Sequence, residues 1–157
     1  MNRSTLVACA LIAVAITAMP RPAHAGPLGL GPRVGFSSGP DQFVLGIGLV
    51  QPLAKQVEIA PSLDFGFGDG GNSISINGDL RYTVAPESGL KPYVGAGLTW
   101  ISFNPDADNV DTSSDFGGNL LGGIWLNKGH WPEFNIEARI GLGDVPDFEG
   151  IVGFKIL

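Results

Sequence analysis

The sequence is short of cysteine, of basic residues and of charge in general. Its single cysteine, Cys9, lies near the amino end, so the chain beyond it cannot form an internal disulfide. Lys and Arg number 9 against 15 Asp and Glu, which argues against a nucleic-acid partner because phosphate binding needs a basic surface. Charged residues are 15% of the 157-residue chain, below the roughly 25% typical of a soluble domain. The low charge therefore disfavours an ordinary soluble protein.

Long apolar runs are missing too, except for one at the amino end. The run over residues 6–19 is about 14 residues long, whereas a transmembrane helix needs roughly 20. It follows a basic start and leads to Ala23-His24-Ala25, a small-x-small cleavage site. We therefore predict a cleaved secretory signal peptide over residues 1–25 and a mature domain over residues 26–157.

In place of helical periodicity, the mature chain has apolar and polar residues in alternation. In residues 73–84 the even positions are apolar or glycine and the odd positions are polar, and residues 132–142 repeat this pattern. A period of two predicts β-strands with one apolar and one polar face. We predict strands at residues 32–37, 41–51, 55–67, 73–84, 91–103, 115–126, 132–143 and 147–157.

Nearly all the predicted connections are short, so neighbouring strands should be antiparallel. Closing the meander on itself removes the free edges of an open sheet, and strands of roughly 11 residues, tilted, span an outer membrane. The predicted fold is all-β, an eight-stranded antiparallel up-and-down transmembrane β-barrel. We expect a bulge at Pro61, which lies inside a strand and lacks an N–H. The glycine-rich first strand predicts a frayed seam with the last strand.

Alternation alone allows two barrels, one with the apolar face outside in a membrane and one with that face inside, as in soluble lipocalins. The low charge favours the membrane barrel. The predicted outward band is Phe43, Leu45, Ile47, Leu49, Val57, Ile59, Leu63, Phe65, Ile136, Ile140 and Leu142. Membrane barrels place aromatic girdles near strand ends, which predicts this position for Tyr82, Tyr93, Trp100, Phe103, Phe116, Trp125 and Trp131.

Polar and charged residues occupy the opposite face of the predicted strands. This set is Glu58, Asp64, Asn77, Asp79, Arg81, Asn119, Glu133, Asn135, Glu137, Arg139, Glu149 and Lys155. Eight strands leave interior space for side chains only, so we expect the charged members to form a lumen charge network that fills the barrel. A small pore is the alternative.

The two ends of the predicted barrel differ in charge. One end carries Asp41, Asp69, Asp106, Asp108, Asp111, Asp115, Asp144 and Asp147, and the other carries Lys55, Lys91, Lys128 and both termini. Termini of such barrels face the periplasm, so the acidic end should face outward. Asp is also a common turn residue. A weaker hypothesis is a divalent-cation site, shared with lipopolysaccharide phosphates, on an acidic outer rim of Asp106, Asp108, Asp111 and Asp115, although their spacing does not fit a calcium loop.

Catalytic motifs are missing from the sequence. It contains no Gly-x-Ser-x-Gly elbow, no metal-spaced His and Cys set and no phosphate-binding loop before a helix. His130 is the only histidine after the predicted leader, and it falls at the Lys-bearing end, where we predict an interfacial turn residue. We predict no enzymatic activity, no metal and no cofactor.

Three segments, Arg33-Val34-Gly35-Phe36, residues 91–98 (KPYVGAGL) and residues 119–123 (NLLGG), resemble the family of small OmpA/OmpX-like outer-membrane barrels. The resemblance implies a Gram-negative outer membrane, contact with its lipid and lipopolysaccharide, and insertion by the barrel-insertion machinery. Family members commonly end in an aromatic residue, whereas this chain ends in Leu157, so Phe154 is the candidate for that role. We predict a non-enzymatic envelope component or surface-interaction scaffold; the alternatives are a soluble lipocalin-like barrel that binds an apolar ligand, and a small pore.

Overall fold

The computed structural model describes residues 28–39, 41–84, 90–106, 112–126 and 133–156. The predicted signal peptide lies outside the described residues. Eight strands make up the described part: β1 (Gly29–Ser37), β2 (Gln42–Pro52), β3 (Val57–Gly68), β4 (Gly71–Thr83), β5 (Lys91–Pro105), β6 (Ser113–Leu126), β7 (Glu133–Gly143) and β8 (Phe148–Lys155). Among these residues, no helix has the length and apolar character needed to cross a membrane.

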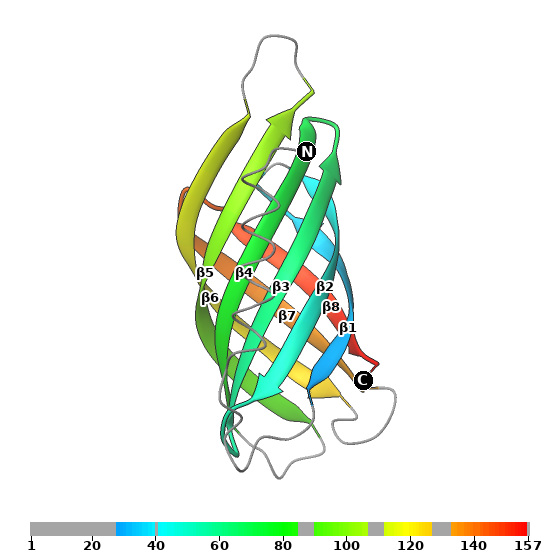
Figure 1. The fold of residues 1–157 in the computed structure, drawn as a ribbon, viewed down its shortest axis with the longest axis vertical. Coiled ribbons are helices and arrows are strands. Elements are labelled where there is room, and N and C mark those ends of the chain that lie inside the picture. Colours follow the sequence, from blue (N-terminus) through cyan, green and yellow to red (C-terminus); the bar gives the residue numbers. More distant parts are fainter. Residues whose placement is uncertain (1–27, 40, 85–89, 107–111, 127–132, 157) are drawn as a thin grey trace.

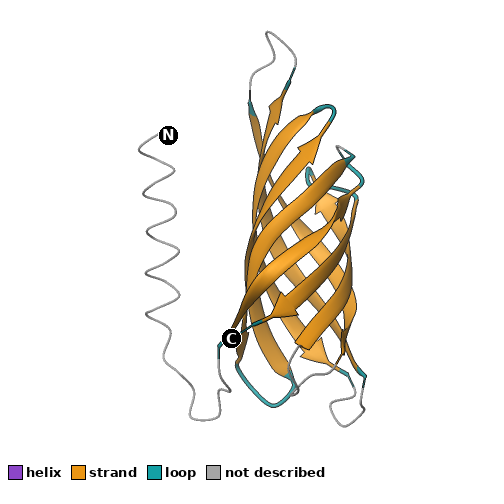
Figure 2. Ribbon diagram, turned by 90° about the vertical axis from the view of Figure 1, so that its right-hand side faces the viewer, coloured by secondary structure: helices purple, strands orange, loops and turns teal. Residues whose placement is uncertain are grey.

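Each strand pairs antiparallel with the next, and β8 closes the sheet by pairing with β1 (Figures 1 and 2). The predicted eight-stranded meander barrel is confirmed. The largest difference in strand bounds is at β1, which begins three residues earlier than predicted, whereas β3, β4, β5, β6 and β8 each differ by two residues at one end. Propensity and alternation locate strands well but place their ends only approximately.

The register of the barrel sets the tilt of its strands. One chain of cross-strand partners begins at Val57 on β3, passes once around the barrel and returns to β3 at Phe67, ten residues further along. For eight strands this offset corresponds to a tilt of about 40°. At this tilt, a strand segment of ten residues, at about 3.3 Å per residue, covers about 25 Å along the barrel axis. This is the height of the apolar band in outer-membrane barrels.

The bulge predicted at Pro61 is wrong. Pairing between β2 and β3 stops after Gly48↔Ser62 and resumes at Gln51↔Ile59 in the same register, so no residue is inserted. On its other side, Pro61 keeps its partner Gly78 on β4. The missing proline N–H therefore interrupts the β2–β3 pairing locally, and the intact register on the β4 side holds the strand in place.

The frayed seam between β1 and β8 is not observed either. Residues 33–37 pair with residues 149–153, and hydrogen bonds continue past both ends of this segment. Ser38 donates its backbone N–H to Phe148 O and Ile156 donates to Leu30 O, each at 2.8 Å. These bonds close the seam despite the short, glycine-rich first strand.

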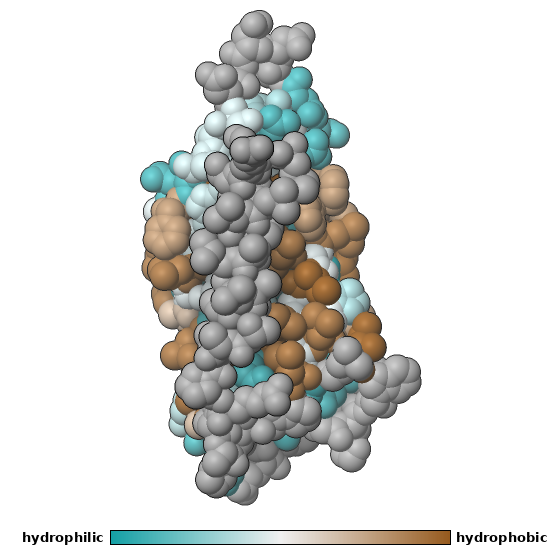
Figure 3. Space-filling view, viewed as in Figure 1, coloured by the Kyte–Doolittle hydropathy of each residue, from teal (hydrophilic) through white to brown (hydrophobic). Residues whose placement is uncertain are grey.

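The apolar face of the strands points outward. Phe43, Leu45 and Ile47 are 47–49% exposed, and apolar side chains gather over the middle of the molecule with polar ones above them (Figure 3). Such a surface suits hydrocarbon rather than water. The outward band is confirmed, and the lipocalin-like alternative, which needs this face inside, is wrong.

Two of the predicted girdle aromatics are misplaced. Tyr93 and Trp125 are each only 2% exposed and lie inside the barrel. On β5 the buried positions are Tyr93, Thr99 and Ile101, whereas Trp100 points outward, so the period of two decides the face even near a strand end. Of the other predicted aromatics, Tyr82 and Phe116 are exposed, Phe103 is half-buried, and Trp131 lies outside the described residues.

Candidate functional site: the lumen charge network

The interior of the barrel holds a dense set of buried charges. The buried basic residues are Arg33, Arg81 and Arg139, and the buried acidic residues are Glu58, Asp64, Asp79, Glu137 and Glu149. Isolated charges in such a place would be very costly, because the low-dielectric wall replaces their hydration. The side chains therefore need partners inside the lumen.

Glu137 on β7 is the centre of this network. Its carboxylate lies 2.7 Å from Arg81 Nη2, 3.0 Å from Arg139 Nη2 and 3.7 Å from Arg33 Nη2. The Tyr93 hydroxyl donates a fourth contact, at 2.9 Å from Glu137 Oε2. One carboxylate thus joins side chains from β1, β4, β5 and its own strand.

Arg139 extends the network toward the acidic end of the barrel. Its Nη2 lies 2.6 Å from Asp79 Oδ2, and its Nη1 lies 3.5 Å from Glu149 Oε2. Asn119 donates to Asp79 Oδ1 at 3.1 Å, which adds β6 to the connected strands. Arg139 and Asp79 are 60 residues apart in the chain, so their contact exists only in the closed barrel.

A relay of amides and hydroxyls completes the ring. Asn119 donates to Thr99, Thr99 to Asn77, and Asn77 to Asp64, at 2.9, 2.7 and 2.9 Å. Asp64 in turn lies 3.2 Å from Arg33 Nε. The network therefore joins β1 and β3 through β8, and such cross-links oppose separation of the strands.

The remaining predicted lumen residues lie nearer the basic end. Lys155 pairs with Glu133 at 3.4 Å in a partly exposed position, and Glu58 is the direct cross-strand neighbour of Arg81. Toward the basic end, Tyr93, Leu121 and Trp125 form a buried apolar cluster. The Arg81 guanidinium lies 5.1 Å from the centre of the Tyr93 ring.

Arg33 and Tyr93 are members of the network that sequence reasoning missed. Arg33 enters the sequence-based expectations only in a family-like segment. Its odd spacing from the apolar Phe36, three residues away, nevertheless predicts that the two side chains lie on opposite faces, and the structure has Arg33 buried and Phe36 exposed. The place of Tyr93 near a strand end predicts a girdle position instead.

Glycines make room for the large interior side chains. A Cβ at Gly46 would collide with the Asp64 carboxylate, and one at Gly97 would collide with Asp79 Oδ1. Large and small residues thus alternate across the lumen, as in other small filled barrels.

The described acidic residues outside the lumen gather at one end of the barrel. Asp41, Asp69, Asp106, Asp144 and Asp147 lie in the turns that follow β1, β3, β5 and β7, and Asp115 lies on the first part of β6. Asp108, Asp111, Lys128 and His130 lie outside the described residues. Within the described ranges, no group of three or more His, Cys, Asp or Glu could hold a metal ion.

Solved structures with the same architecture fit nearly the whole barrel. The N-terminal β-barrel domain of Pseudomonas aeruginosa OprF aligns with a TM-score of 0.61 and 19% identity, over 82% of this chain and 97% of that domain. Neisserial surface protein A (NspA) aligns with a TM-score of 0.63 and 15% identity, over 83% of this chain and 96% of that one. The fold is that of a small outer-membrane barrel.

The outer membrane enzyme PagL also aligns, with a TM-score of 0.50 and 17% identity, over 83% of this chain and 99% of that one. No protein-family model and no curated protein matches the sequence. At these identities the similarity establishes the outer-membrane barrel fold, and that fold includes an enzyme, so it does not decide the activity.

Proposed function

We propose that this chain is a non-enzymatic outer-membrane barrel that serves as an envelope component or a surface-interaction scaffold with a sealed interior. The observation that carries the proposal is the pairing of the interior charges. Glu137, Arg139 and Asp79 form ion pairs with side chains of the barrel wall, so they support the barrel rather than a reaction. The network fills the space that a pore would need.

The outward band and the different charge of the two ends support an orientation of the barrel in the membrane. We propose that the end with the β2–β3 and β4–β5 turns, which bears Lys55 and Lys91, faces the periplasm. The acidic end then faces outward, next to lipopolysaccharide. Export by the signal peptide predicted over residues 1–25 and insertion by the barrel-insertion machinery belong to this proposal, with outward-facing Phe154, 44% exposed, as the terminal aromatic.

A small pore is the second candidate, because the lumen is lined with polar side chains along most of its length. A pore requires the Glu137–Arg139–Asp79 contacts to open, since they occupy the middle of the barrel.

Membrane fractionation and conductance together test the proposal. We expect the full-length protein, expressed in a Gram-negative host, to sediment with the outer membrane and to migrate differently on gels before and after boiling. In planar bilayers we expect no stable single-channel currents. Recovery in the soluble fraction would refute the membrane location, and steady currents that change when Arg139→Met is introduced would favour the pore.

A further inference from the structure

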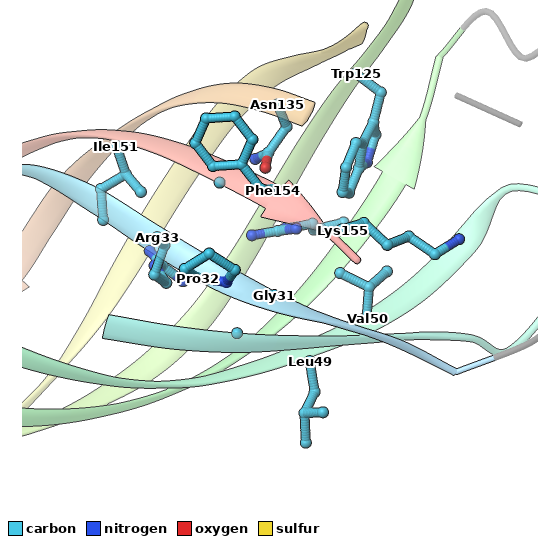
Figure 4. Close-up of a pocket in the computed structure, with 13 residues that line it drawn as sticks. Gly31, Pro32, Arg33, Leu49, Val50, Trp125, Asn135, Ile151, Phe154 and Lys155 are labelled. Carbon is cyan, nitrogen blue, oxygen red and sulfur yellow. The ribbon is translucent and has the colours of Figure 1, made fainter. Parts of the chain in front are cut away.

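A cavity inside the barrel is too small for a large partner. It lies between β1, β2 and β8 toward the basic end, where Arg33, Trp125 and Asn135 surround it (Figure 4), and its volume is about 30 Å³. This volume suits one or two water-sized groups. A polypeptide that meets this barrel therefore has to bind to an outer surface, and the acidic end offers one.

The sheet reaches further on one side of the acidic end than on the other. β5 and β6 are the longest of the described strands, with 15 and 14 residues, and in Figures 1 and 2 they extend beyond β7 and β8. Residues 113–116 of β6 pair with residues 100–103 of β5, whereas pairing with β7 begins only at Gly117↔Gly143. Within the described ranges, no strand pairs with residues 113–116 on the side away from β5. We call this side of residues 113–116 the free edge of β6.

The free edge exists because β7 turns away from β6. Gly143 ends β7 with a φ of 95°, a left-handed conformation that glycine adopts without strain. The turn that follows bends toward the lumen, since Val145 is buried and a Cβ at Gly117 would lie 2.9 Å from Val145 Cγ1. The β7–β8 turn therefore lies at the lumen side of β6 and leaves the free edge accessible.

The free edge lies at the limit of the apolar outer surface, on its water side. Trp100 and Phe116 are cross-strand partners that both point outward. One step further toward the acidic end, the outward positions hold Ser102 and Ser114, whose hydroxyl oxygens lie 3.2 Å apart. Hydroxyl groups favour water over hydrocarbon. The free edge is thus in water, with Phe116 at the boundary.

The backbone of the free edge has hydrogen-bonding groups to offer. Ser102 Oγ on β5 donates to Ser113 O at 3.3 Å, so this carbonyl faces β5. Successive residues of a strand direct their backbone groups to opposite sides, so the N–H and C=O of Ser114 and Phe116 point to the free edge. A row of such groups is a template for one further strand.

The two sides of the free edge differ in chemistry. Asp115 lies on the lumen side, where the β7–β8 turn carries exposed Asp144 and Asp147, whereas Phe116 lies on the membrane side and is 63% exposed. The connections at this end contain no Lys or Arg; they are residues 38–41, 69–70, 106–112 and 144–147. An added strand is therefore stabilised by basic side chains toward the lumen side and apolar ones toward the membrane side, and these two sets alternate along a strand.

We propose that the free edge of β6 binds an extended polypeptide segment in which basic and apolar residues alternate, as an added antiparallel strand. This inference rests on the proposed surface-interaction role and names the class of partner for it. A second copy of this chain is not that partner, because its own acidic end lacks the basic residues.

A short blocked peptide of alternating lysine and valine is the probe. We expect the labelled peptide to bind saturably, by fluorescence anisotropy, to the protein in nanodiscs of zwitterionic phosphatidylcholine and not to empty nanodiscs. A peptide of alternating glutamate and valine should not bind, because the acidic side chains repel it. Equal binding of the two peptides, or binding of neither, would overturn the proposal.

Amide hydrogen exchange, measured by NMR, locates the contact without any substitution. We expect saturating lysine–valine peptide to slow exchange at Ser114 and Phe116 by at least about tenfold, since their N–H groups gain partners. Exchange at Ser113, whose N–H faces β5, should change little. Unchanged exchange at Ser114 and Phe116 with the peptide bound would show that it binds elsewhere, and the proposal would be wrong.

Two pairs of variants separate the backbone from the charge. Ser114→Pro removes an N–H of the free edge and should weaken peptide binding at least about tenfold, whereas Ser114→Ala keeps this N–H and should bind as the wild type. Asp144→Asn should weaken binding about threefold, the effect of one exposed ion pair. Asp69→Asn makes the same change in the exposed β3–β4 turn, two strands from β6, and should have no effect. Equal affinities of Ser114→Pro and Ser114→Ala would contradict strand addition.

Intact cells distinguish this inference from the proposed function. Binding in nanodiscs does not depend on where the cell places the barrel, whereas binding to Gram-negative cells that express it requires the acidic end to face outward. Binding to both supports the free edge and the proposed orientation. Binding to nanodiscs but not to cells would support the free edge and show that the proposed orientation is wrong.

Discussion

The inner and outer faces of the same eight strands obey opposite rules. Outside, Phe43, Leu45 and Ile47 are 47–49% exposed, and an apolar surrounding stabilises such a surface. Inside, Arg33, Arg81 and Arg139 are as buried as a hydrophobic core, yet they are tolerated because carboxylates from other strands meet them. A substitution should therefore cost little or much according to the face it touches, even at adjacent positions of one strand.

The largest effect is expected from Glu137→Gln, which removes the central charge and keeps the side-chain size. Three arginines then lose a partner in a low-dielectric interior, and we expect the free energy of unfolding to fall by about 3–5 kcal/mol. Urea unfolding of the refolded barrel in detergent measures it. A loss below about 1 kcal/mol would show that water or other carboxylates replace Glu137 at no cost.

A charge on the outer face should cost nearly as much. Leu45→Arg places a guanidinium in the middle of β2, toward lipid and away from every lumen carboxylate, and we expect a loss of about 2–4 kcal/mol. Guanidinium unfolding in phospholipid vesicles measures this loss, with Leu45→Ala as the control for lost apolar area. If Leu45→Arg were no worse than the alanine variant, β2 would not face hydrocarbon.

Adding one methyl group should separate the two faces more gently. Gly97→Ala drives a Cβ into Asp79 and should destabilise by about 1–3 kcal/mol through overpacking. Gly78→Ala makes the same change in the adjacent strand, on the lipid side where there is space, and should stay within about 0.5 kcal/mol of the wild type. Equal costs for both would mean that the lumen is loosely packed.

The smallest effect is expected where the interior opens to water. Lys155→Gln removes one partner of the Lys155–Glu133 pair, whose side chains are 21% and 14% exposed. We expect a loss of less than about 1 kcal/mol, because water and salt screen a partly exposed ion pair. A loss as large as that of Glu137→Gln, measured in the same detergent, would place Lys155 among the essential members of the network.

Much of the architecture could be predicted from local pattern. Alternation located all eight strands, and low charge indicated that the apolar side of Leu45 and Ile47 lies outward. The errors came where a second local rule competed with alternation. Closeness to strand ends predicts a girdle position for Tyr93 and Trp125, whereas the period of two places both inside the barrel. The missing N–H of Pro61 predicts a bulge, which its pairing with β4 makes unnecessary.

By itself, the sequence determined which side chains share a face, because a period of two is a property of the extended backbone. It also determined the meander, because its short connections allow only antiparallel neighbours. The tertiary structure alone decided which charges meet. Closure with a ten-residue offset brings Arg33 of β1 to Glu137 of β7 and Asp79 of β4 to Arg139, contacts that depend on the register of every strand between them. Each hairpin sets the register of one pair of neighbouring strands only, so the contacts across the lumen follow only when all eight pairings close together.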